Sequence, residues 1–129
     1  MGRRIPPKPT NSELEILRVL WVRGPSTVRE VLESLDPEGS TGYTTVLKLM
    51  QIMARKKLVQ RDVSQRTHVY RATLSEEDTQ KRLVGDLLDR AFGGSATKLI
   101  MQALGGRKTT PEEIREVRRL LKELEGGKS

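Results

Sequence analysis

The helix start signals in this sequence constrain its fold more than any other feature. In a capping box, the hydroxyl of a Ser or Thr just before a helix accepts a hydrogen bond from the backbone N–H three residues later. The side chain of a Glu at that later position accepts one from the N–H of the Ser or Thr in return. Such pairs divide the chain into short helices: Thr10 with Glu13 or, overlapping it, Ser12 with Glu15, then Thr27 with Glu30, and Thr110 with Glu113. A chain of 129 residues so divided has room for one or two small, mainly α-helical domains.

The first two helices are expected to be short and amphipathic. Their apolar stripes are Leu14, Leu17, Leu20 and Trp21 in the first, and Val28, Val31, Leu32 and Leu35 in the second. Gly24-Pro25 ends the first segment, and Asp36-Pro37-Glu38-Gly39 ends the second with a turn. The spacing predicts that both helices bury one face in a common core.

A third helix, predicted from Thr41 or Gly42 to about Lys57, has two faces of different character. At 100° per residue one side carries Val46, Leu49, Met50, Met53 and Ala54, and the opposite side carries Thr44, Lys48, Gln51 and Arg55. A helix that enters the major groove of DNA needs such a polar face opposite an anchored apolar one. By itself, the polar face is equally typical of a solvated surface.

After the third helix the pattern changes to β-branched segments around Ser64-Gln65-Arg66. This change predicts a two-stranded hairpin, the wing of a winged helix. Arg66 at its tip, with Arg61 and Arg71 nearby, suits contacts to the minor groove or to phosphates. A lone basic side chain is more often an ordinary exposed residue.

The fold class expected is mainly α with a small β-hairpin. We assign a flexible basic arm to residues 1–9, a winged helix-turn-helix to 10–73, a helical dimerisation segment to 74–125 and a frayed tail to 126–129. The helical segment is too thin to bury all its apolar stripes on its own, so these stripes need a partner. The expected interface is Val84, Leu87, Leu88, Phe92, Leu99, Ile114, Val117, Leu121 and Leu124.

The positive charge is concentrated in the first part of the chain. Residues 1–73 hold 13 Lys and Arg against 7 Asp and Glu, whereas residues 74–129 hold 11 against 10. A basic excess in one half is typical of a module that binds a polyanion. The expected partner is double-stranded DNA, and the candidate contacts are Tyr43, Thr44, Thr45, Lys48, Gln51, Arg55, Arg61, Arg66 and Arg71.

Composition argues against several other classes of protein. There is no Cys and only one His, His68, so thiolate metal sites are excluded and a catalytic triad lacks its parts. We expect no enzyme activity, no catalytic residue and neither metal nor cofactor. No apolar stretch reaches the ~18 residues of a membrane span, which predicts a soluble cytoplasmic protein without membrane insertion. Two alternatives to a sequence-specific DNA-binding protein remain: a winged-helix protein-interaction module and a nonspecific DNA-binding protein.

The sequence resembles the penicillinase-repressor family of bacterial winged-helix transcriptional regulators, from about Pro9 to Leu124. The likeness rests on the order of its motifs, which are residues 12–17 with Leu20-Trp21, residues 44–50 leading to 56–59, Val69-Tyr70-Arg71, residues 92–95 and residues 111–114. It implies a homodimer on a pseudo-palindromic operator that represses genes, typically for antibiotic resistance. It also implies release when a membrane sensor-protease system cuts or displaces the repressor.

Several positions depart from what this resemblance implies, among them Ile52, where many family members have Arg, and Lys48, where Thr is frequent. The family's resistance repressors are cleaved at an Asn-Phe bond in the helical tail, where this chain has Gln102-Ala103. At the end of the third helix, Lys57 occupies a position where family members usually have Gly.

Overall fold

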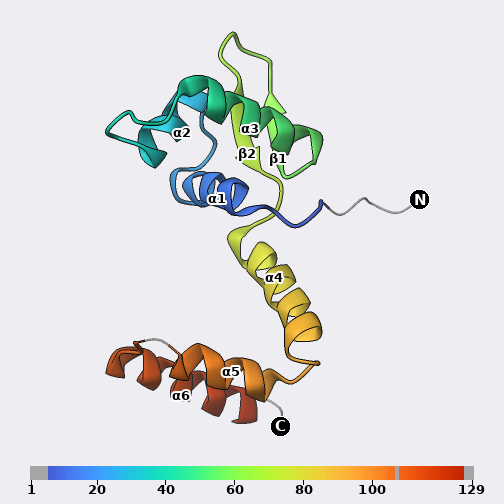
Figure 1. Cartoon of the computed structure of the whole chain (residues 1–129), viewed down its shortest axis with the longest axis vertical. Coiled ribbons are helices and arrows are strands. Elements are labelled where there is room, and N and C mark those ends of the chain that lie inside the picture. The colour runs from blue at the N-terminus through green and yellow to red at the C-terminus, as the bar shows by residue number, and fades with distance from the viewer. Residues whose placement is uncertain (1–5, 107, 127–129) are drawn as a thin grey trace, which may run out of the picture. The chain divides into compact units, whose positions relative to one another are not determined.

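The computed structural model describes residues 6–106 and 108–126 (Figure 1). Its contacts divide the chain into two compact units, one up to Val84 and one from Gly85 onward. The helices are α1 (Asn11–Arg23), α2 (Val28–Leu35), α3 (Tyr43–Arg55), α4 (Glu76–Ala91), α5 (Ala96–Gly105) and α6 (Pro111–Gly126). The strands are β1 (Val59–Asp62) and β2 (Val69–Ala72). Three helices followed by a hairpin and further helices confirm the predicted fold class.

Local side-chain chemistry starts α1 and α2 where the sequence predicts. The Thr10 hydroxyl accepts a hydrogen bond from the Glu13 N–H at 3.2 Å, and Glu13 Oε1 accepts one from the Thr10 N–H at 3.0 Å. Thr27 and Glu30 repeat this arrangement at 3.1 and 2.9 Å. Both capping boxes are therefore confirmed.

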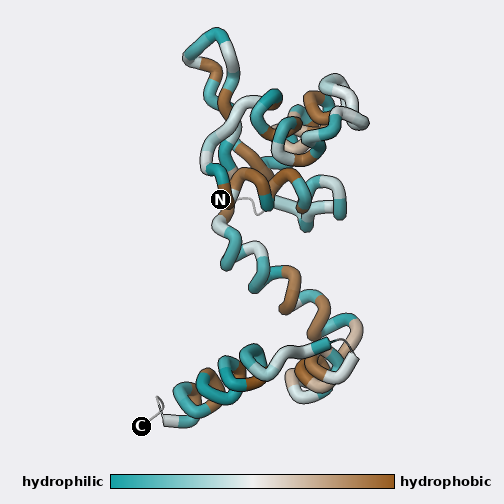
Figure 2. Tube along the Cα trace, turned by 90° about the vertical axis from the view of Figure 1, so that its left-hand side faces the viewer, coloured by the Kyte–Doolittle hydropathy of each residue, from teal (hydrophilic) through white to brown (hydrophobic). Residues whose placement is uncertain are grey.

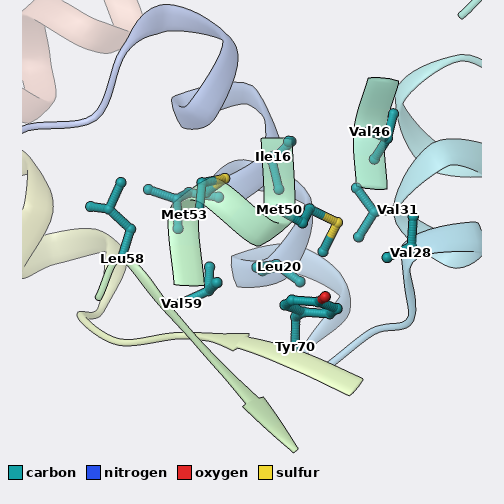
Figure 3. Close-up of a cluster of buried hydrophobic side chains, with 11 residues drawn as sticks. Ile16, Leu20, Val28, Val31, Val46, Met50, Met53, Leu58, Val59 and Tyr70 are labelled. Atoms are coloured by element: carbon teal, nitrogen blue, oxygen red, sulfur yellow. The ribbon is translucent and has the colours of Figure 1, made fainter. Parts of the chain in front are cut away.

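The core of the first unit lies between α1, α2, α3 and the hairpin (Figure 3). Its buried hydrophobic residues are Ile16, Leu17, Leu20, Val28, Val31, Val46, Met50, Met53, Leu58, Val59 and Tyr70. Trp21, expected in the core, is only partly buried at its edge, where Nε1 donates to the Leu74 carbonyl at 3.0 Å. That bond satisfies the indole N–H and joins α1 to the segment that leads into α4.

The hairpin is extended by one residue from the loop between α1 and α2. Strands β1 and β2 pair antiparallel, and Ser26 pairs with Tyr70 on the other side of β2. The Ser26 N–H donates to the Tyr70 carbonyl at 2.9 Å, and the Tyr70 N–H donates to the Ser26 carbonyl at 2.8 Å. These bonds tie the base of the wing to the helices.

The start of the described chain and the first turns of α4 belong to the first unit. Pro6 is buried, and its carbonyl accepts a hydrogen bond from the Arg82 guanidinium. Thr79 is also buried, and the Ser75 hydroxyl accepts from the Asp78 N–H at the beginning of α4. Part of the predicted flexible arm, residues 6–9, is thus placed against the folded unit, and residues 1–5 lie outside the described residues.

The second unit consists of the end of α4 with α5 and α6. In the described chain, neither α5 nor α6 has a buried residue. Hydrophobic residues recur along these helices (Figure 2). Seven large apolar side chains from Val84 onward are about half exposed or more, namely Val84, Leu87, Ile100, Met101, Leu120, Leu121 and Leu124.

Candidate nucleic-acid interface

Helix α3 presents a polar stripe on the side away from the core. Val46, Met50 and Met53 are buried with 1% exposure or less. The stripe itself is Thr44, Lys48, Gln51 and Arg55, of which Gln51 is half-buried and the others are exposed. Tyr43 and Thr45, at the start of the helix, are exposed as well. A rigid helix thus carries two cationic side chains and an amide on one outward face.

The loop before α3 is ordered by a carboxylate. Asp36 Oδ2 accepts hydrogen bonds from the Ser40 hydroxyl at 2.9 Å and from the Thr41 N–H. The bond from the Thr41 backbone lowers the pKa of Asp36 most, and the Ser40 hydroxyl adds to the effect. The loop is therefore fixed just before Gly42. Gly42 is the N-cap residue of α3 and makes no side-chain capping hydrogen bond.

The end of α3 is a Schellman turn built on a lysine. The Leu58 N–H donates to the Met53 carbonyl at 2.9 Å, and the Lys57 N–H donates to the Ala54 carbonyl at 3.1 Å. Lys57 itself has a φ of 70°, in the left-handed region that favours Gly. This backbone explains why Gly suits the position. Helix α3 therefore ends at Arg55, two residues before the predicted limit.

An ion pair between a buried glutamate and a half-buried lysine holds the end of α3 on the start of α1. Lys56 Nζ lies 2.7 Å from Glu13 Oε2, and Glu13 is only 2% exposed. Burial raises the pKa of Glu13, but hydrogen bonds from Lys56 and Thr10, together with the Lys56 charge, outweigh it and lower that pKa. Glu13 therefore caps α1 and fixes α3 at once. Sequence analysis identified only the cap.

The three wing arginines divide between the two faces of the hairpin. Gln60 pairs with Arg71, and Arg61 pairs with Tyr70. Because side chains alternate along a strand, Arg61 shares the face of buried Tyr70, whereas Arg71 lies on the other face. Gln60 Oε1 accepts two hydrogen bonds from the Arg71 guanidinium, at 2.7 and 3.1 Å. Arg61 and Arg71 therefore start from opposite faces of the hairpin, although both line one hollow together with Pro25.

Arg61 lies close to the C-terminal half of the α3 stripe. Gln51, Ala54, Arg55 and Arg61 line one surface hollow. This hollow gathers three of the predicted DNA contacts, two of them cationic. An amide and two guanidinium groups in one concave patch offer many hydrogen-bond donors to base edges or phosphates.

The wing tip lies near the N-terminal end of α3. A second hollow is lined by Thr27, Val28, Arg29, Tyr43, Leu47, Arg66, Thr67, His68 and Tyr70. It contains two predicted contacts, Tyr43 and Arg66. It also contains Arg29, which sequence analysis missed. The sequence signal that could have identified Arg29 is its position in the first turn of α2, because the helix dipole favours acidic residues there.

Asp62 shapes the turn that leads to the wing tip. Its Oδ1 accepts a hydrogen bond from the Ser64 N–H at 2.9 Å, the geometry of an Asx turn. This backbone bond is the main cause of the lowered pKa of Asp62. One carboxylate oxygen of Asp62 therefore already accepts a hydrogen bond from the backbone of the wing.

Other kinds of site find little support in the described residues. Between residues 6 and 106 and between 108 and 126, no group of three His, Asp or Glu side chains is arranged to hold a metal ion. His68 is exposed. No helix in these ranges is both long enough and apolar enough to cross a membrane.

Comparison with known proteins agrees with this arrangement. Residues 9–123 match the family model described as Penicillinase repressor. The chain is 32% identical over 117 residues to the transcriptional regulator BlaI of Mycobacterium tuberculosis, covering 89% of this chain and 83% of that protein. It is 22% identical over 117 residues to the penicillinase repressor of Bacillus licheniformis, covering 91% of each. With the penicillinase repressor of Staphylococcus aureus it shares 18% over 113 residues, or 88% of this chain and 90% of that one.

The match spans both units of the structure, from just before α1 to the last turns of α6. It therefore includes the core, the polar stripe of α3, the wing and the apolar stripes of the tail. The chain belongs to the penicillinase repressor family, a family of non-enzymatic transcriptional repressors.

Proposed function

We propose that this chain is a sequence-specific DNA-binding repressor that acts as a homodimer on a pseudo-palindromic operator. The observation that carries the proposal is the outward stripe of α3, where Lys48 and Arg55 are exposed while the opposite face is buried in the core. Relatives of the chain are named as penicillinase repressors and as a transcriptional regulator.

In this proposal α3 lies in the major groove. Lys48 and Arg55 donate to guanine acceptors or to phosphates, and Gln51 pairs with adenine. Tyr43, Thr44 and Thr45 contact phosphates or base edges near the N-terminal end. The wing flanks the groove, with Arg61 on the side of α3, Arg66 at the tip and Arg71 on the outer face. The core holds the stripe rigid, so little order is lost on binding.

The dimer is proposed from the tail. In α6, Ile114, Val117, Leu121 and Leu124 follow the three-and-four spacing of a coiled-coil seam. The ion pairs of Arg119 with Glu116 and Glu123 lie on the other side of this helix. A second copy would cover the seam together with Val84, Leu87, Leu88, Phe92 and Leu99. The resulting two-fold symmetry would match a palindromic site.

Control of the repressor is proposed by analogy with its family. The regulated genes would be for antibiotic resistance or stress, and a membrane sensor-protease system would relieve repression in the cytoplasm. Gln102 and Ala103, at the place where the resemblance implies the cleaved Asn-Phe pair, are exposed in α5, and neither is the residue that this cut requires. We therefore propose that release occurs by displacement rather than by that cut.

A genome-fragment pull-down tests the proposal. Purified protein is incubated with sheared genomic DNA at physiological salt, and the retained fragments are sequenced. A shared short inverted repeat is expected. Retention without a common motif would indicate a nonspecific DNA-binding protein, and no retention would indicate a protein-interaction module.

A matched pair of variants sharpens this experiment. Lys48→Ala/Arg55→Ala removes two charges from the proposed recognition face and should abolish enrichment of the repeat. Arg18→Ala/Lys122→Ala removes two charges from exposed positions of α1 and α6 and should retain it. Equal behaviour of the two variants would contradict the assigned face.

A further inference from the structure

The hollow between α2, the start of α3 and the wing tip concentrates positive charge. Arg29 and Arg66 line it together with Thr67 and His68, and none of its nine lining residues is acidic. Two like charges in one hollow repel each other unless an anion lies between them. The lining therefore favours an anionic ligand that also accepts hydrogen bonds.

Arg29 is held in place by an aromatic ring rather than by a carboxylate. Its guanidinium carbon lies 5.1 Å from the centroid of the Tyr43 ring, within the range of a cation–π interaction. A stacked guanidinium keeps its N–H edge open for a further partner. The interaction thus orients Arg29 at the first turn of α3 without consuming its donors.

The carboxylate next to Arg29 in sequence is engaged elsewhere. Glu30 Oε1 accepts from the Thr27 N–H at 2.9 Å, and Glu30 Oε2 lies 3.6 Å from Arg23 Nη2. Within residues 6–106 and 108–126, Arg29 itself has no ion pair. Arg23 and Arg71 differ from Arg29 in this respect. Arg23 forms an ion pair with Glu30, and Arg71 donates hydrogen bonds to the side chain of Gln60.

We infer that Arg29 is a phosphate-binding residue that, with Arg66, holds one phosphodiester of the DNA backbone beside the N-terminal end of α3. This inference rests on the proposed DNA binding. Tyr43 then acts in part as a positioning residue, because its ring presents the Arg29 guanidinium. A phosphate held at this point fixes how α3 enters the groove, although it carries no sequence information itself.

Salt dependence measures this contact directly. Each neutralised phosphate contributes about 0.9 to the slope of log K against log salt concentration. A fluorescein-labelled DNA duplex that carries the inverted repeat retained in the pull-down is titrated by anisotropy from about 0.05 to 0.3 M salt. For Arg29→Ala we expect the slope to fall by about one and the affinity to fall roughly fivefold near physiological salt.

Two further variants serve as controls. Arg29→Lys retains the point charge but not the planar fork, so most of the slope should return while the affinity recovers only in part. Arg18→Ala removes the same charge from an exposed position of α1 that lines none of the hollows described above, and it should leave the slope at the wild-type value. Thermal melts by circular dichroism establish that each variant is folded.

The outcomes separate this inference from the proposed function. Wild-type binding with a reduced slope only in Arg29→Ala supports both. Wild-type binding with the same slope in Arg29→Ala as in Arg18→Ala overturns the role of Arg29 and leaves DNA binding intact. Failure of the wild-type protein to bind the duplex overturns DNA binding and, with it, the inference.

Discussion

The two units of this protein use their hydrophobic residues in opposite ways. In the first unit, eleven hydrophobic side chains from α1, α2, α3 and the hairpin are buried together (Figure 3). In the second, the described parts of α5 and α6 bury none, and Leu121 and Leu124 are 50% and 64% exposed. The comparison teaches that amphipathic helices complete a fold only where enough of them converge. The first unit has its own core, whereas the described helices α5 and α6 of the second leave their apolar side chains without one.

The largest expected effect is a loss of stability in the first unit. Ile16 is fully buried, so Ile16→Ala removes apolar contacts and leaves a cavity. We expect the free energy of unfolding to fall by about 3 kcal/mol. Chemical denaturation measures this change. The control is Leu124→Ala, at an exposed site in α6, measured at a protein concentration too low for dimerisation. If both variants lost the same free energy of unfolding, the contrast between the two units would be refuted.

The next effect concerns the second unit. Leu121→Asp places a charge in the proposed seam of α6, and we expect dimerisation to weaken by about 2 to 3 kcal/mol, which is roughly a hundredfold. Analytical ultracentrifugation gives the dissociation constant. Lys122→Asp introduces the same side chain at the adjacent position outside the seam and should leave the dimer largely intact. A Leu121→Asp protein that still sediments as a dimer would contradict the proposed interface.

A smaller effect tests whether the polar stripe of α3, in the first unit, recognises DNA. Lys48→Ala or Arg55→Ala should weaken binding to the recovered operator by about 1 to 3 kcal/mol if the side chain contacts a base. Arg71→Ala should have less effect, since Arg71 is on the outer face of the wing and bonded to Gln60. Fluorescence titrations compare the three variants. Unchanged curves for both α3 variants would refute the proposed recognition face.

Lys57→Gly should increase stability while leaving the contacts of the core unchanged. At a φ of 70° a residue with a Cβ is strained, and Gly relieves that strain. We expect a gain of about 1 kcal/mol in the free energy of unfolding, partly offset by the greater freedom of Gly in the unfolded chain. Thermal unfolding measures the change. A loss of stability would mean that the Lys57 side chain contributes more than its backbone costs.

The smallest effect is the acid dependence of the ion pair between Glu13 and Lys56. Because the pKa of Glu13 is lowered in the folded state, the stability it contributes is present above its ordinary value of 4.5. That stability is lost as the pH falls through the lowered pKa. Between pH 7 and about pH 3 the wild-type protein should lose more stability than Glu13→Gln, by less than about 1 kcal/mol. Parallel losses in both proteins would show that the pair does not control acid sensitivity.

Local chemistry explains why much of the first unit is predictable. A capping box involves residues only three apart, so Thr10 and Glu13 start α1 whatever lies around them. The stripe of α3 follows from helical spacing in the same way, and its apolar and polar sides are where the periodicity placed them. The end of α3 was predicted two residues too late, because Lys57 adopts a backbone conformation usual for Gly.

Contacts between distant residues escaped sequence analysis for a physical reason. Glu13 and Lys56 are 43 positions apart, and nothing in the local pattern relates them. The same holds for Trp21 with Leu74, 53 positions apart, and for Arg29 over Tyr43. The opposite placement of Arg61 and Arg71 depends on the register of β1 and β2, which pairing between strands sets.

The sequence by itself thus determined where helices begin, which faces are apolar and which family the chain resembles, because these depend on neighbouring residues. Only the tertiary structure decided which charges far apart in sequence are paired, which are gathered in a hollow and which hydrophobic residues are buried. Those properties arise when segments far apart in sequence are packed together, and burial then decides whether a side chain stabilises the fold or remains for a partner.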